Sequence, residues 1–272
     1  MDSFNKKVKD FCCQKNNQLC LGLDLDNRNL KDPSLSYYKS FIFDIIESTI
    51  DLCPIYKINF SFFERLSSDG FKIIELISEK IGNRAIKIAD AKRGDIGNSS
   101  KYYSEAILEN LNFDAITVSP YMGYDSILPF CENKSKGVFI LCLTSNKGSN
   151  NFQNKIIDGE ELYKHVAKFA VEMNLNNNIG LVVGATQPDK MLDLRKISKS
   201  LPWLIPGVGH QGGNLDESIT ISSKNDSIGI INVSRGILNY NNGSIEDIYE
   251  ATKLYTDKIR GLLWIQKKYW IY

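Results

Sequence analysis

The chain has 272 residues, of which 43% are hydrophobic and 24% charged. This composition can bury a core, which excludes a disordered chain, and the length suits one large domain. The 33 basic and 32 acidic residues leave a net charge of +1, which gives no electrostatic reason to bind nucleic acid or an anionic membrane. The chain begins with charged residues and lacks both a signal peptide and an apolar run of the ~18 residues that a transmembrane helix needs. We therefore expect a cytoplasmic protein with no nucleic-acid or membrane partner.

Short apolar, β-branched runs alternate with longer amphipathic segments along the whole chain. Strands are predicted at residues 19–23, 55–59, 85–89, 115–118, 138–143, 179–183, 203–205 and 228–233. Helices are predicted at residues 37–50, 70–81, 99–111, 126–131, 160–173, 189–200, 215–222 and 244–267, with surface loops at 133–136, 145–154 and 174–178. Apolar strands that alternate with helices are typical of parallel strands buried on both faces. The pattern predicts an α/β fold, a single (β/α)8 TIM barrel over residues 1–272, and the alternative is an open doubly wound sheet.

The cysteines and histidines indicate neither disulfide nor zinc chemistry. The six cysteines show no C-x-x-C pair and no spacing of a secreted framework, so we expect reduced, mostly buried thiols. His165 and His210 lack the spacing of paired metal ligands, which makes a histidine-based zinc site improbable. His165 lies on a predicted helix, where we expect it at the surface.

Charged residues occur where the second and third strands reach the carboxyl end of a barrel, the place of the active site in this fold. Lys57 and Asn59 share one face of the second strand because side chains alternate along a strand. Asp90 and Lys92 share a face of the third, and Asp95 follows in the loop. Charges beside a buried strand are costly unless they are paired or functional. These four charges therefore predict an array of opposed charges at the barrel mouth, and a salt-bridge network that only closes the barrel is the alternative.

The loops after the last two strands predict an anion site. The segment from Pro206 to Asn214 contains four glycines, which let backbone N–H groups approach a phosphate, and Arg235 follows the eighth strand. We interpret this glycine-rich segment as a lid in which Gln211 contacts the ligand and His210 faces solvent. A merely flexible loop is the alternative.

Polar groups also end the first and fifth strands. Asp24 follows the first strand, and Thr144 and Ser145 follow the fifth. The two hydroxyls could bond the polar edge of a ring, and a local turn stabilised by the same hydroxyls is an equal alternative.

Together these segments resemble the orotidine 5′-phosphate decarboxylase family over nearly the whole chain. The matching motifs are Gly22-Leu23-Asp24, Lys57-x-Asn59, Asp90-x-Lys92-x-x-Asp95-Ile96-Gly97-Asn98, Thr144-Ser145, Pro206-Gly207-Val208-Gly209, Gln211-Gly212 and Arg235-Gly236. Residues 57–64 and 144–153 are similar to the longer-chain branch found in some bacteria and in malaria parasites. The resemblance implies decarboxylation of orotidine 5′-phosphate to UMP, the last step of de novo pyrimidine synthesis, without metal or organic cofactor.

The resemblance also implies a role for each matching residue. Lys92 would protonate C6 of the pyrimidine as CO₂ leaves, with Asp90 beside the departing carboxylate and paired with the lysines. Lys57 would contact the ribose and the charge array, Asp24 would hold a ribose hydroxyl, and Asn59 would belong to the same substrate-binding set.

The resemblance implies further roles in contacts with the pyrimidine and the phosphate and across a subunit interface. The resemblance implies that Asp95, Ile96 and Ser99 are supplied across the interface of a homodimer with shared active sites; Ser99 stands where many relatives carry threonine. The remaining substrate contacts it implies are those of Thr144 and Ser145 with the pyrimidine and those of Pro206, Gln211 and Arg235 around the phosphate. An association with orotate phosphoribosyltransferase, which makes the substrate, is left open.

Two other functions compete with this interpretation. A sugar-phosphate decarboxylase or hexulose-phosphate synthase of the same barrel group shares D-x-K-x-x-D but uses Mg²⁺ and carries a carboxylate where this chain has Lys57. A lysine there would repel Mg²⁺, whose sites use carboxylate oxygens. A non-catalytic barrel that binds a phosphorylated ligand would require a lost catalytic group, yet all four charges are present, and a scaffolding role leaves them without a purpose.

Overall fold

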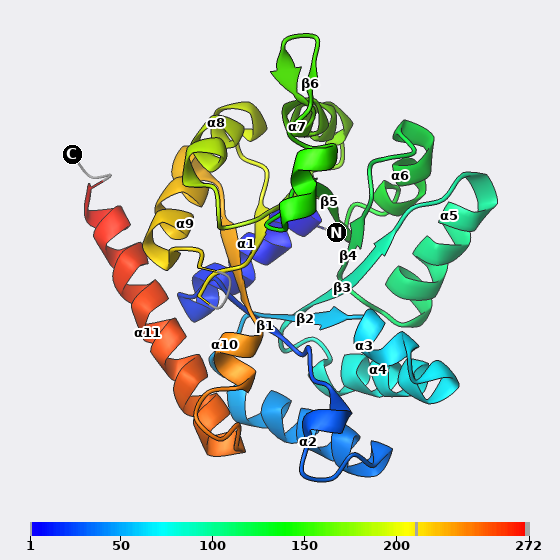
Figure 1. Ribbon diagram of the computed structural model, residues 1–272, viewed down its shortest axis with the longest axis vertical. Coiled ribbons are helices and arrows are strands. Elements are labelled where there is room, and N and C mark those ends of the chain that lie inside the picture. The colour runs from blue at the N-terminus through cyan, green and yellow to red at the C-terminus, as the bar shows by residue number, and fades with distance from the viewer. Residues whose placement is uncertain (1, 210–211, 270–272) are drawn as a thin grey trace.

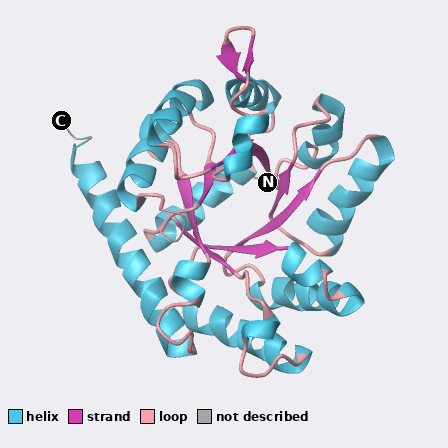
Figure 2. Cartoon of the chain, in the orientation of Figure 1, coloured by secondary structure: helices cyan, strands magenta, loops and turns pink. Residues whose placement is uncertain are grey.

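Eight apolar runs of the sequence form parallel strands that close into a barrel, with helices around the outside (Figures 1 and 2). The computed structural model describes residues 2–209 and 212–269. The barrel strands are β1 Leu19–Gly22, β2 Ile55–Asn59, β3 Ile86–Arg93, β4 Ala115–Val118, β5 Gly137–Leu143, β8 Ile179–Val183, β9 Trp203–Pro206 and β10 Gly229–Val233. Their order around the barrel is β1-β10-β9-β8-β5-β4-β3-β2. The predicted single (β/α)8 barrel is confirmed, and the doubly wound alternative is wrong.

Amphipathic helices cover the outside of the strands, as the sequence predicts. They are α2 Leu35–Thr49, α4 Ser67–Ile81, α5 Gly97–Ser104, α6 Tyr124–Cys131, α7 Leu162–Met173, α8 Pro188–Ser198, α9 Leu215–Ser222 and α11 Ile245–Tyr269. The helix predicted at 99–111 begins two residues earlier and continues beyond α5 as a π-helical segment, Glu105–Asn110. Two short helices that the periodicity does not reveal, α3 Ser61–Glu64 and α10 Arg235–Leu238, follow directly after β2 and β10.

An additional helix, α1 Phe4–Lys15, closes the amino-terminal end of the barrel and was not predicted (Figure 1). Its Phe4, Val8 and Cys12 are buried in the same cluster as side chains from inside the barrel. Phe4 meets Phe139 edge-on with ring centroids 5.9 Å apart. A Cβ at Gly137 would lie 2.3 Å from the Phe4 ring, so only glycine fits beneath it. With this end filled, the barrel is open to ligands at the carboxyl ends of its strands.

A small hairpin projects from the barrel between β5 and α7 and consists of β6 Ile156–Ile157 and β7 Glu160–Glu161 (Figure 1). His165 lies partly exposed on α7 and contacts the Ile157 carbonyl oxygen through Nε2 at 2.8 Å. His165 therefore has a structural contact at the surface, in keeping with its predicted place.

The cysteines and the helices agree with two further expectations. All six cysteines are unpaired, and five of them are buried. Burial raises the pKa of the Cys53 and Cys131 thiols to about 12, which keeps them protonated and inert. Among the helices of residues 2–209 and 212–269, none has the length and apolar character that crossing a membrane requires.

Candidate active site

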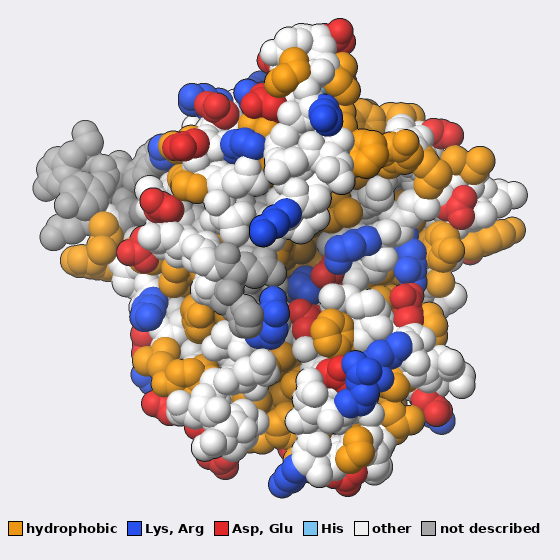
Figure 3. Space-filling model, viewed as in Figure 1, with side chains coloured by type: hydrophobic (Ala, Val, Ile, Leu, Met, Phe, Trp, Pro, Cys, Tyr) orange, Lys and Arg blue, Asp and Glu red, His pale blue; other side chains and the backbone are white. Residues whose placement is uncertain are grey.

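A cavity of about 700 Å³ opens at the carboxyl ends of the barrel strands. Basic and acidic side chains meet in the hollow at the centre of this face (Figure 3). Of the predicted site residues, those that line the cavity are Asp24, Lys57, Asn59, Asp90, Pro206 and Arg235. The structure thus brings together groups from five separate strand ends that are up to 211 positions apart in the chain (24 to 235).

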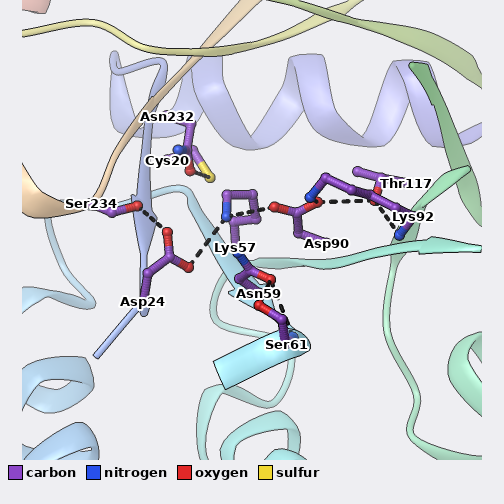
Figure 4. A network of polar contacts seen from close by, with 10 residues as sticks. All are labelled: Cys20, Asp24, Lys57, Asn59, Ser61, Asp90, Lys92, Thr117, Asn232 and Ser234. Carbon is purple, nitrogen blue, oxygen red and sulfur yellow. Dashed lines mark hydrogen bonds and ion pairs between the residues drawn. The ribbon is translucent and has the colours of Figure 1, made fainter. Parts of the chain in front are cut away.

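Strand register places the first three charges side by side. Gly22 of β1 pairs with Lys57 of β2, and Asn59 of β2 pairs with Asp90 of β3. The Lys57 Nζ atom lies 3.4 Å from Asp24 Oδ1 and 3.0 Å from Asp90 Oδ2 (Figure 4). Lys57 is only 4% exposed, so its ammonium has exchanged water for two carboxylates. Such a buried charge persists only when partners of this kind surround it.

Asp90 joins the two lysines of the array. Its Oδ2 atom accepts from Lys57, and its Oδ1 atom accepts from Lys92 Nζ at 2.5 Å and from the Thr117 hydroxyl at 3.1 Å (Figure 4). The charges therefore alternate in sign along Asp24, Lys57, Asp90 and Lys92. Lys92 itself lies at the edge of this array and is exposed, whereas Asp90 is largely buried.

The array holds Lys57 and Asp90 in their charged forms. Burial by itself lowers the pKa of Lys57, but the charges of Asp24 and Asp90 outweigh burial and raise that pKa above its usual value. Burial likewise raises the pKa of Asp90, and the two lysines more than reverse this and lower it to about 2. Near neutral pH Lys57 and Asp90 therefore both remain ionised.

Lys92 reaches Asp90 through a bulge in β3 rather than through regular alternation. The pairing of β3 with β4 is Ala89 with Ile116 and then Arg93 with Val118, so four steps along β3 match two steps along β4. Lys92 occupies this bulge with a φ of 47°, in the left-handed region. The prediction that Asp90 and Lys92 lie together is confirmed, although it did not include the bulge in which Lys92 lies. Bulges redirect side chains next to active sites.

A second contact fixes Asp24 on the opposite side of Lys57. The Ser234 hydroxyl donates to Asp24 Oδ2 at 2.6 Å (Figure 4). A Cβ at Gly22 would lie 2.0 Å from Ser234 Oγ, so a glycine is required for β1 and β10 to bring these two side chains together. Asp24 thus accepts from Ser234 with one oxygen and faces Lys57 with the other.

The glycine-rich segment after β9 folds back on itself beside Arg235. Gly207 and Gly209 have φ values of 96° and 77°, a region that favours glycine, and the Gly213 N–H donates to the Gly207 carbonyl at 3.1 Å. Within residues 2–209 and 212–269, the Arg235 side chain makes no hydrogen bond or ion pair. The predicted ligand contact Gln211 and the neighbouring His210 lie outside the described residues.

The other predicted residues lie apart from the cavity lining in the described chain. Asp95 Oδ1 accepts the N–H of Ile96 at 2.8 Å, and Ile96 and Ser99 are exposed on the outer side of the mouth. Thr144 is engaged by Gln153, whose Nε2 donates to the Thr144 hydroxyl at 2.8 Å. Ser145 follows Thr144 at the end of β5. In this single chain the fourth charge, that of Asp95, is therefore not part of the array.

Three polar residues at the site were not assigned a role from the sequence. Asn232 lies on β10, Ser234 follows that strand directly before Arg235, and both line the cavity. Thr117 lies within the apolar strand β4, where a threonine is indistinguishable from a β-branched core residue. No sequence pattern singles out Asn232 or Ser234, because Asp24, the partner of Ser234, is distant in the chain. Among the described residues no group of three or more His, Cys, Asp or Glu side chains could hold a metal ion.

Comparisons with known proteins agree in one family. The sequence profile of the "Orotidine 5′-phosphate decarboxylase / HUMPS family" matches residues 17–245. The chain is 47% identical over 246 residues to the orotidine 5′-phosphate decarboxylase of Dehalococcoides mccartyi (strain BAV1), covering 89% of this chain and 90% of the relative. It also resembles the solved structure of Leishmania donovani OMP decarboxylase, at a TM-score of 0.85 and 34% identity, over 96% of this chain and 98% of the other. The Leishmania donovani UMP synthase structure matches at a TM-score of 0.86 and 35% identity, covering 96% of this chain but 57% of that longer one.

The ionised array predicts a pH dependence of stability that centres on Asp90. A carboxyl whose pKa is lowered on folding, here to about 2, stabilises the folded state above its unfolded pKa of roughly 4, and this contribution is lost as the pH falls toward the folded value. The contribution is about 2 kcal/mol in total. We therefore expect the free energy of unfolding of the native chain to exceed that of Asp90→Asn at pH 5, and the difference to shrink at pH 3, as measured by urea unfolding.

The matched control is Asp44→Asn, which changes an exposed carboxyl of α2. Its difference from the native chain should not follow that of Asp90→Asn between the two pH values. An Asp90→Asn difference that is the same at pH 5 and pH 3 would contradict the electrostatic account of the array.

Proposed function

Because the chain belongs to the orotidine 5′-phosphate decarboxylase / HUMPS family, we propose that it decarboxylates orotidine 5′-phosphate to UMP, the last step of de novo pyrimidine synthesis. The name shared by its bacterial relatives and by the similar Leishmania structure supports this reaction. The observation that carries the proposal is the alternating array Asp24–Lys57–Asp90–Lys92 at the cavity. The enzyme would then be a carboxy-lyase.

The array suits a reaction in which negative charge develops on carbon. Loss of CO₂ from C6 of the pyrimidine leaves a carbanion with little resonance stabilisation, so the barrier must be lowered mainly by charges that are already in position. A lysine ammonium near C6 stabilises that charge and can then donate the proton that completes the product. Among the lysines of the array, Lys92 fits this role because it is the exposed one at the end of the chain of charges, whereas Lys57 is enclosed by two carboxylates.

The carboxylates have two different tasks in this mechanism. Asp90, held ionised with its pKa at about 2, would lie beside the substrate carboxylate and make its departure favourable while it orients both lysines. Asp24 and Asn59 line the cavity on either side of Lys57 and would hold the ribose. Such contacts bind parts of the substrate that do not react and thereby position the part that does.

The two loops after β9 and β10 would bind the phosphate. Arg235 lines the cavity and has no partner of its own within the described residues, so its guanidinium is available for a bidentate contact with an anion. Pro206 begins the turn whose glycines bring backbone close to the same place. Gln211 would complete this phosphate site, and Thr144 and Ser145 at the end of β5 would contact the pyrimidine.

Lys57 argues against the magnesium-dependent chemistry of the rival barrel enzymes. Its ammonium lies between Asp24 and Asp90, the two carboxylates that a metal at this position would need as ligands. Mg²⁺ binds through carboxylate oxygens and water, and an ammonium group at 3.0 and 3.4 Å from those oxygens competes for them directly. We therefore propose a reaction without metal or organic cofactor.

We further propose that two chains form a homodimer in which Asp95, Ile96 and Ser99 complete the active site of the neighbouring subunit. In one chain the Asp95 carboxylate does not reach the array, although its position in the motif assigns it there. Exposed apolar side chains surround this segment, namely Ile96, Tyr102, Tyr121, Met122 and Tyr124. Figure 3 shows apolar side chains gathered on the side of the molecule where α5 and α6 lie. An exposed apolar patch of this kind is typical of a protein–protein interface.

An association with orotate phosphoribosyltransferase, the enzyme that makes the proposed substrate, is a further proposal. The Leishmania donovani UMP synthase contains a region similar to this chain within a longer polypeptide. This arrangement is consistent with an association of the two activities, which the present chain would achieve as a complex of separate proteins.

The reaction is tested directly with the purified protein. We expect it to convert orotidine 5′-phosphate to UMP in the presence of EDTA, followed as the loss of orotate-type ultraviolet absorbance. Lys92→Ala should lower kcat by roughly a thousand-fold, because it removes both the charge at C6 and the proton donor. Lys72→Ala, which removes an exposed lysine of α4, is the control and should leave kcat unchanged. No turnover by the native protein, or an absolute need for Mg²⁺, would refute the assignment.

The phosphate contact is tested by Arg235→Ala. Loss of charge-assisted hydrogen bonds to a phosphate should raise KM by about ten- to a hundred-fold. The control Arg84→Ala removes an arginine that pairs with Glu47 on the outside of the barrel, so it alters net charge equally without touching the cavity. An unchanged KM for Arg235→Ala would show that the anion site lies elsewhere.

The shared site is tested by mixing inactive variants. Lys92→Ala and Asp95→Asn chains, unfolded and refolded together, should regain about a quarter of native activity, since half of the dimers are mixed and each of these has one intact site. Lys92→Ala mixed with Asp90→Asn is the control and should regain none, because both changes affect the same chain's part of the site. If the first mixture also regains none, Asp95 does not act across the interface.

A further inference from the structure

Lys92 has a backbone conformation that its own sequence does not favour. A lysine with a φ of 47° is strained, because its Cβ approaches the following carbonyl oxygen. Such conformations persist where surrounding contacts enforce them, and they cluster at active sites. The contacts that hold the Lys92 backbone therefore decide where its ammonium lies.

A single hydroxyl from the neighbouring strand connects the Lys92 backbone to the Asp90 side chain. Thr117 Oγ1 on β4 accepts the Lys92 N–H at 3.0 Å and donates to Asp90 Oδ1 at 3.1 Å (Figure 4). That same Asp90 oxygen accepts from Lys92 Nζ at 2.5 Å. Both ends of the lysine are thus linked to one carboxylate oxygen, the backbone N–H through the Thr117 hydroxyl and the ammonium directly, and Thr117 is only 1% exposed.

The residues on either side of Lys92 are anchored separately. The Ser119 N–H donates to the Arg93 carbonyl at 2.8 Å, where regular pairing with β4 resumes. The Arg93 side chain donates to the Ala91 carbonyl at 3.2 Å and forms an ion pair with Glu64 of α3. These contacts fix the ends of the bulge, but none of them bonds the Lys92 N–H itself. That bond is left to Thr117.

We propose that Thr117 is a positioning residue for the decarboxylation, an inference that rests on the proposed function. Its hydroxyl satisfies the Lys92 N–H in the left-handed conformation and turns the Asp90 carboxylate so that one oxygen faces Lys92 and the other faces Lys57. Without the hydroxyl, the partly buried N–H of Lys92 and a carboxylate oxygen of Asp90 each lose a partner. The bulge can then relax, and Lys92 leaves the position from which it reaches C6.

The test compares variants of Thr117 that keep or remove the hydroxyl at nearly constant shape. Thr117→Val should lower kcat by about ten- to a hundred-fold with little change in KM, because a misplaced catalytic group affects the transition state while the ribose and phosphate contacts remain. Thr117→Ser retains the hydroxyl and should restore kcat to within a few-fold of the native value. Thr117→Ala should lower kcat in the same way, and it replaces Thr117→Val in the test if that variant does not fold.

The control is Thr252→Val, which removes an equally buried hydroxyl that, among the described residues, bonds only the Ile248 carbonyl of its own helix, α11. It should leave kcat and KM unchanged, which separates positioning from a general effect of removing a buried hydroxyl. The dissociation constant for UMP, measured by calorimetry, should be the same for native and Thr117→Val proteins.

The possible results distinguish this inference from the proposed function. If the native enzyme is active and Thr117→Val has the native kcat, only the role of Thr117 is overturned. The same holds if Thr117→Ser is as impaired as Thr117→Val. A Thr117→Val crystal structure in which Lys92 keeps its left-handed φ and its contact with Asp90 would also overturn that role. A native protein without decarboxylase activity would overturn the proposed function and, with it, the role assigned to Thr117.

Discussion

The burial of one ammonium group between two carboxylates determines the arrangement of the rest of the site. Lys57 is almost completely removed from water, and the transfer of a lone charge of this kind costs several kcal/mol. Asp24 on one side and Asp90 on the other offset that cost only if β1, β2 and β3 align in the observed register. A shift of one residue would turn the side chains to the opposite face and leave the charge unpaired. The array therefore constrains the strand register of the barrel as well as forming the centre of the site.

Because the amino-terminal end of the barrel is closed, the array faces the opening at the carboxyl ends of the strands. α1 fills the amino-terminal opening with Phe4, so the cavity and the charges share the one remaining mouth. There the strand ends supply fixed charges, while the segments after β9 and β10 supply glycine-rich backbone and the guanidinium of Arg235, which has no partner among the described residues. This separation of the charges from the anion-binding segments suits the proposed reaction. That reaction needs a fixed electrostatic field around the reacting carbon and binding energy from a distant phosphate.

The strained backbone of Lys92 and the contacts that hold it lie at the same point of the site. Lys92 lies in a bulge with a left-handed backbone, held by Thr117 and, through its neighbours, by the contacts of Arg93. Regular alternation would also have put Lys92 on the face of Asp90, but the bulge decides the distance and direction of its ammonium. The aromatic and aliphatic side chains exposed near Asp95 mark where a second chain would contribute the charge that this chain keeps outside its own cavity.

The sequence by itself determined the barrel, because short continuous apolar runs and helical segments with period 3.6 are local properties of the chain. It also identified Lys57, Asp90 and Lys92 as a group, since each directly follows or interrupts a buried strand. It did not reveal α1, whose short apolar face depends on the barrel end that it covers, nor the π-helical segment after α5. Only the tertiary structure decided that Ser234 bonds Asp24 and that Thr117 bonds Asp90 and Lys92, because these partners lie 210, 27 and 25 positions apart and their hydroxyls look the same as any other in sequence. Contacts between distant strands arise from closure of the barrel, which no local pattern encodes.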